Sequence, residues 1–272
     1  TDADGTATLG NGGDGIFVSS GADDTLIGGT GTHDGNWVAG NGVVGIEVEG
    51  ASTGTVIQGN RIGTDLAGTA DWGQGQNGIL LEGGASDTLV GGTAAGAANV
   101  IAFNGRGGVW TSGIAVTGVG SQGNVIVGNS IYDNVGLGID LGNDGVTAND
   151  ADDSDVGPNG LLNTFELSQA VTDGGTLQLN GAFSGAANTF YRVELFSSTQ
   201  ADASGHGEGR TYLGAIDLPV GASGTVSGSY SLGVVVPVNT VITATATRTD
   251  ATYTTFHETS EFSNAVVASA PN

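Results

Sequence analysis

The sequence contains no cysteine and no methionine, and all five of its basic residues are arginine. Without cysteine, disulfide bonds cannot stabilise the chain, which is compatible with a large extracellular protein whose stability comes from a repetitive hydrogen-bonded backbone. No apolar run approaches the roughly 20 residues that cross a bilayer, which argues against membrane insertion. Against 28 acidic residues the five arginines leave a net charge of −23. This charge repels nucleic acids and anionic lipid and attracts divalent cations.

The chain is organised around a long internal repeat. Shifted by 63 positions, TDADGTATLGNGGDGIFVSSGADDTLIGGT lies without a gap over TDLAGTADWGQGQNGILLEGGASDTLVGGT. Self-similarity at a fixed period is the signature of a solenoid, in which each unit buries its apolar face against the next. The repeat therefore predicts a solenoid.

A shorter theme recurs inside the long repeat. Five Gly-Ile starts lead into the trios IFV, IEV, ILL, IAV and IDL, whose first and third residues are apolar while the second varies. This period-2 pattern predicts short strands with one buried face. Asparagine suits tight corners, and stacked copies can bond from coil to coil. We therefore predict a corner ladder from the asparagines that fall five residues apart, namely Asn36/Asn41, Asn99/Asn104 and Asn124/Asn129/Asn134.

With its NVIxxN and Gly-Ile motifs, the region from 1 to about 165 resembles the right-handed parallel β-helix repeats of bacterial secreted and cell-surface proteins, a group that also contains pectate-lyase-like enzymes. After Phe165, alternating segments such as YRVELFSS and TVITATATR predict an antiparallel sandwich. In the surface proteins that the chain resembles, such a module is often immunoglobulin-like. The expected fold is all-β, with a right-handed parallel β-helix over 1–166 and a β-sandwich over 167–272.

An acidic stretch joins the two predicted domains. Carboxylates crowded into one ordered loop repel each other unless a hard cation neutralises them, and Ca²⁺ takes six to eight oxygen ligands. The alternative is a solvated acidic linker that binds nothing. The metal hypothesis rests on Asp140, Asp144, Asp150, Asp152, Asp153 and Asp155.

Three tryptophans and one arginine are the candidate ligand-binding residues. Trp37 stands where the second repeat has Val100, Trp72 stands where the first has Leu9, and Trp110 and Arg106 lie in an insertion. Exposed aromatic planes stack on sugars, although a tryptophan can instead seal a loop against the coil. Alternation predicts that Trp37 and Trp110 face outward, with Val38 and Val109 inward. Arg106 could reach an anionic ligand.

A catalytic group is not evident in the sequence. Glu47 and Asp140 share a strand row, but three circuits at about 4.8 Å each separate them by about 14 Å, too far for a glycosidase pair. We expect a calcium-stabilised structural or adhesive module, secreted or on the cell surface, whose partner is a polysaccharide or surface glycan. Alternatives are a polysaccharide lyase or epimerase of the same fold, and a filament subunit that self-associates through the open N-terminal coil. The sequence leaves open whether the chain is an enzyme, and the lack of an evident catalytic group argues against it.

Overall fold

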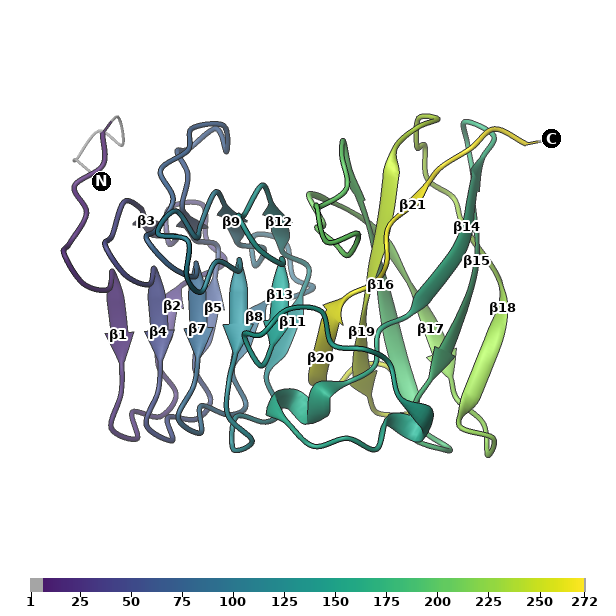
Figure 1. Cartoon of the computed structure of the whole chain (residues 1–272), viewed down its shortest axis with the longest axis horizontal. Coiled ribbons are helices and arrows are strands. Elements are labelled where there is room, and N and C mark those ends of the chain that lie inside the picture. Colours follow the sequence, from purple (N-terminus) through teal and green to yellow (C-terminus); the bar gives the residue numbers. More distant parts are fainter. Residues whose placement is uncertain (1–6, 272) are drawn as a thin grey trace.

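The computed structural model describes residues 7–271 as a row of stacked coils that ends against two antiparallel sheets (Figure 1). The predicted open end at Thr1 lies outside the described residues. The coils contain three parallel sheets, as the all-β solenoid prediction requires. No helix among residues 7–271 is long and apolar enough to span a membrane.

The parallel strands occur once per sheet in each circuit. The first sheet has the order β1 (Ile16–Val18), β4 (Ile46–Val48), β7 (Ile79–Leu81), β10 (Ile114–Val116), β13 (Ile139–Leu141). The second has the order β11 (Val125–Val127), β8 (Leu89–Gly91), β5 (Val56–Gln58), β2 (Leu26–Gly28). The third has the order β12 (Ser130–Tyr132), β9 (Val100–Ala102), β6 (Arg61–Ile62), β3 (Trp37–Val38).

The first residue of each trio lies in one inward column. Ile16 pairs with Ile46, Ile46 with Ile79, and the column continues through Ile114 to Ile139. From Ile46 onward these side chains are at most 1% exposed, and each contributes on the order of 1.5–3 kcal/mol by burial. The 63-residue repeat therefore spans two circuits, since Ile16 and Ile79 lie two rungs apart.

Amide side chains form two ladders at the corners, as predicted. In the first, Asn36 donates to Asn60, Asn60 to Asn99, and Asn99 to Asn129, with Nδ2–Oδ1 distances of 2.9, 3.0 and 2.9 Å. In the second, Gln74 takes the place of one asparagine and accepts from Asn41 Nδ2 at 2.9 Å. Further along, Asn104 Nδ2 donates to Asn134 Oδ1 at 2.9 Å. These bonds satisfy buried turn groups that would otherwise lack partners.

The C-terminal part is a two-sheet antiparallel sandwich. One sheet has the order β14 (Glu166–Thr172), β15 (Leu177–Ser184), β18 (Thr225–Leu232). The other has the order β17 (Thr211–Pro219), β16 (Phe190–Ser198), β19 (Val241–Thr249), β20 (Phe256–Phe262), and β21 (Val266–Val267) also pairs with β19. Their inner faces enclose a core that includes Phe165, Tyr191 and Ile242. The connection from the solenoid carries two short 3-10 helices, η1 (Ala151–Asp153) and η2 (Pro158–Leu161).

The sandwich closes the last coil of the solenoid, against which β20 and β19 lie (Figure 1). Phe196 and Phe262 join the apolar core of the solenoid. Three buried glutamates accept hydrogen bonds from the last coil: Glu194 from Gly128 N (2.8 Å), Glu208 from Asn134 Nδ2 (2.7 Å) and Glu261 from Leu141 N (2.9 Å). They supply acceptors that a further coil would otherwise provide. Because the core is shared, the division of the chain at 166/167 into separate domains stays a prediction.

Candidate functional site

The acidic connection brings three of the six predicted metal ligands together. Asp150, Asp153 and Asp155 offer carboxylate oxygens that lie within 4.8 Å of one another. Calcium binds oxygen at 2.3–2.6 Å, so one ion between these oxygens could contact all three. The residues therefore fit a hard divalent cation in ligand type and spacing.

Local hydrogen bonds hold the three carboxylates in place. The Asp150 carboxylate accepts from Ser154 N and Oγ (3.1 and 2.8 Å), and these bonds lower its pKa. Asp153 Oδ1 accepts from Asn163 N at 2.8 Å, but burial raises its pKa to about 6. Burial and the charge of Asp150 also raise the pKa of Asp155. The repulsion among these groups is the kind that a bound cation would relieve.

The other three predicted ligands lie apart from this group. The Asp152 side chain is exposed and outside it. Asp140 is 5% exposed and accepts from Ser112 Oγ (3.1 Å) and Asp144 N (3.1 Å), while its burial raises its pKa. Asp140 thus fixes the turn that follows β13, and Asp144 borders a different hollow.

The hollow that Asp144 borders has a volume of 610 Å³ and is also lined by Trp110 and Asp140. Trp110 is 52% exposed and faces outward, as predicted. The expectation for Val109 is wrong, because its side chain is 62% exposed. Residues 109–110 lie in no strand, so side chains there need not alternate between two faces.

A groove of 1040 Å³ lies beside the third parallel sheet and contains His33, Trp37 and Arg61. Trp37 is half-buried, whereas Val38 points into the core, as predicted. Trp37 and Arg61 are direct partners on neighbouring rungs. The other residues of its walls are small, polar or aliphatic: Thr30, Gly31, Thr32, Gly35, Asn36, Gly59, Leu66, Ala95, Gly96 and Ala98. The sequence singled out Trp37, but the register of β3 and β6 is what brings Arg61 beside it.

The remaining candidates, Trp72 and Arg106, border neither the groove nor the Trp110 hollow. Arg106 pairs instead with Asp71 at 3.6 Å, and both side chains are more than half exposed. An exposed pair of this kind stabilises little. Trp72 is half-buried, and its backbone O accepts from Gly40 N (2.8 Å).

One acidic group was not anticipated. Glu47, Glu49 and Glu82 have carboxylate oxygens within 4.8 Å of one another. Burial, followed by the charges of Asp14, Glu82 and Glu49, raises the pKa of Glu47 to about 7. Aligning the Gly-Ile starts could have found this group, because Glu49 and Glu82 each follow directly after a trio and so occupy neighbouring rungs.

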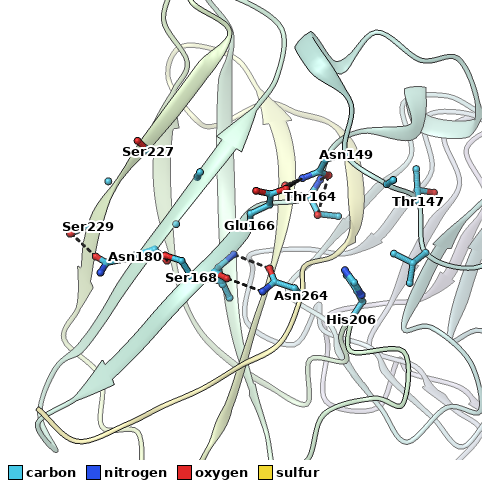
Figure 2. A pocket seen from close by; sticks show the side chains of 16 residues that line it. Thr147, Asn149, Thr164, Glu166, Ser168, Asn180, His206, Ser227, Ser229 and Asn264 are labelled. Carbon is cyan, nitrogen blue, oxygen red and sulfur yellow. Dashed lines mark hydrogen bonds between the residues drawn. The ribbon is translucent and has the colours of Figure 1, made fainter. Parts of the chain in front are cut away.

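The sandwich also carries a hollow, of 720 Å³, on the face of β14, β15 and β18 (Figure 2). Small residues form its floor, and His206, Glu166 and Asn264 stand around it. Asn264 is fixed by bonds to Leu167 N and O (2.9 and 2.8 Å). Two smaller hollows, of 300 and 340 Å³, contain Glu208 and Asp150 respectively.

Comparison with known proteins gives no assignment: no protein-family model matches the chain, and no curated protein matches it.

Proposed function

We propose that the chain is a secreted or surface-attached structural and adhesive module that binds glycans. One observation carries this proposal: an outward tryptophan, Trp37, lines an open groove on a rigid solenoid. Aromatic faces stack on sugar rings, and a hydrogen-bonded scaffold holds such a face without a large ordering cost on binding. The extracellular setting is inferred from the resemblance to secreted and cell-surface β-helix repeats, and the cysteine-free composition is compatible with it.

The same proposal includes calcium bound by Asp150, Asp153 and Asp155. The site lies in the connection between solenoid and sandwich, so an ion there would neutralise like charges and stiffen that connection. We also infer kinship with the bacterial right-handed β-helix repeat proteins and an immunoglobulin-like origin of the sandwich. The three stacked sheets and the amide ladders support the first inference.

A glycan array probed with the purified chain tests the function. We expect a limited set of glycans to bind, and we expect Trp37→Ala to abolish this binding while Trp72→Ala, outside the groove, preserves it. Repeating the array with Ca²⁺ and with chelator separates calcium-dependent binding from calcium-dependent stability. If no glycan binds under either condition, the adhesive role is refuted.

A polysaccharide-active enzyme is the second candidate, and the Glu47 group favours it. A carboxyl with a pKa of about 7 among other carboxylates could act as a general acid near neutral pH. Incubation with polyuronates and neutral polysaccharides, followed by product analysis, would reveal it, and Glu47→Gln should then abolish turnover. A third candidate, the filament subunit, predicts long polymers in light scattering.

A further inference from the structure

The groove that contains Trp37 differs in charge from the rest of this acidic chain. Each of the four other hollows described above is bordered by at least one carboxylate, from Glu166, Glu208, Asp140 or Asp150. The Trp37 groove has none, although it is the largest of the five, and it contains Arg61 and His33. An acid-free cavity is notable where acids outnumber bases 28 to 5.

Arg61 is also the one arginine without an ion pair among residues 7–271. Arg106, Arg192, Arg210 and Arg248 each pair with a carboxylate. Two aspartates, Asp34 and Asp65, lie in the loops around the groove without lining it, and each accepts hydrogen bonds from the backbone of its own loop. Asp65 accepts from Thr69 N and Ala70 N (2.7 and 3.0 Å), and Asp34 accepts from Gly31 N (2.8 Å).

The walls of the groove are held by contacts that do not involve Arg61 or Trp37. Tyr132 Oη donates to Gly68 O at 2.6 Å and so fastens the loop that carries Leu66. The loops that contain Thr30 and Gly96 lie close together at the backbone, since a Cβ on Gly96 would lie only 2.2 Å from Thr30 O. Such a groove is formed before any ligand arrives, which lowers the ordering cost of binding.

We propose that this groove binds an acidic saccharide, with the sugar ring on Trp37 and its carboxylate or sulfate on Arg61. Trp37 and Arg61 are register partners on adjacent strands, whose backbones lie about 4.8 Å apart, so one sugar residue is large enough to contact both side chains. A guanidinium binds either anion through two parallel hydrogen bonds. The net charge of −23 does not prevent this, because charges farther than about 8 Å are largely screened at physiological ionic strength. The inference rests on the proposed glycan-binding function and narrows it to an anionic class.

Calorimetric titration with three oligosaccharides of equal length tests the proposal: a uronate oligomer, a sulfated oligomer and a neutral one. We expect tighter binding of an acidic oligomer, with an affinity that falls as salt is raised. Comparison of the uronate and sulfated arms identifies which anion is held. Arg61→Gln should weaken acidic binding about tenfold or more, since a charge-assisted bond is lost, and should leave any neutral binding unchanged.

Matched variants separate this site from general charge effects. Arg106→Gln removes the same charge outside the groove and should bind like the unmodified chain. Arg61→Lys keeps the charge without the planar fork and should retain part of the affinity. Melting temperatures of all variants confirm that they fold.

Three outcomes overturn the inference. If Trp37-dependent binding favours the neutral oligomer, or if Arg61→Gln binds acidic oligomers as tightly as the unmodified chain, the acidic class is wrong but the adhesive function stands. If none of the oligomers binds and the glycan array is also empty, both proposals fail.

Discussion

Glu208 should make the folded chain less stable as the pH rises from about 5 to 7. Its carboxyl is 6% exposed between sandwich and solenoid, and burial raises its pKa from 4.5 to about 8 despite the hydrogen bonds from Asn134. Asp133, Asp202 and Arg210 line the same hollow as Glu208. The negative charges of the two aspartates raise the pKa of Glu208 further. The folded chain therefore keeps a proton that the unfolded chain has lost.

Proton linkage gives the direction and the size of the change in unfolding free energy with pH. Where the folded state binds one more proton than the unfolded state, the free energy of unfolding falls by about 1.4 kcal/mol per pH unit. The stabilisation is complete below pH 4.5 and is lost as the pH rises through about 8. Over two pH units Glu208 alone accounts for about 3 kcal/mol. Glu261, whose pKa burial raises to about 7, adds to the effect in the same direction.

Urea unfolding at pH 5, 6 and 7, followed by tryptophan fluorescence, measures this dependence. In Glu208→Gln the side-chain carbonyl still accepts from Asn134, but no proton is lost. We therefore expect the slope of unfolding free energy against pH to be shallower by about 1.4 kcal/mol per unit. Glu166→Gln, at an exposed glutamate of the same sandwich, is the control and should leave the slope unchanged. Parallel plots for Glu208→Gln and the unmodified chain would refute the linkage.

Three further predictions concern calcium, the ladder and the shared core. Chelator should lower the melting temperature, and Asp153→Asn should remove this response whereas Asp152→Asn, outside the carboxylate group, should keep it; identical melting with Ca²⁺ and chelator would contradict the site. Asn99→Ala should lower the free energy of unfolding by about 3 kcal/mol, because partners in Asn60, Ile57 and Asn129 lose their bonds; a near-neutral effect in urea unfolding, like that expected for Asn180→Ala, whose side-chain bonds lie at the sandwich surface, would mean that the ladder contributes little. Phe262→Ala should cost about 3–5 kcal/mol and should loosen sandwich and solenoid together, since Phe262 belongs to the solenoid core; calorimetry showing only the sandwich affected would argue against a shared core.

The sequence by itself determined the parts of this fold that repeat. The Gly-Ile trios predicted that their first and third residues face inward, and the five-residue spacing of asparagines predicted the corner ladder. The prediction of one buried face fails in β7, β10 and β13, because the middle residues Leu80, Ala115 and Asp140 are buried too. Both patterns are local and periodic, and each copy faces a similar copy one rung away, so the partner of a residue is known once the period is known. Even the Glu49–Glu82 proximity was available from that period.

Only the tertiary structure decided contacts that do not repeat. Glu194, Glu208 and Glu261 read as ordinary polar residues of sandwich strands and loops, yet they bond to the last coil across 66, 74 and 120 residues. The fold also divided the predicted metal ligands into separate groups. It brought Asp150, Asp153 and Asp155 together, and it buried Asp140 beside Ser112. Arg61 came to lie unpaired beside Trp37 only through strand register and loop placement. Such contacts depend on how loops and sheets far apart in the chain pack in three dimensions, and no local pattern encodes that.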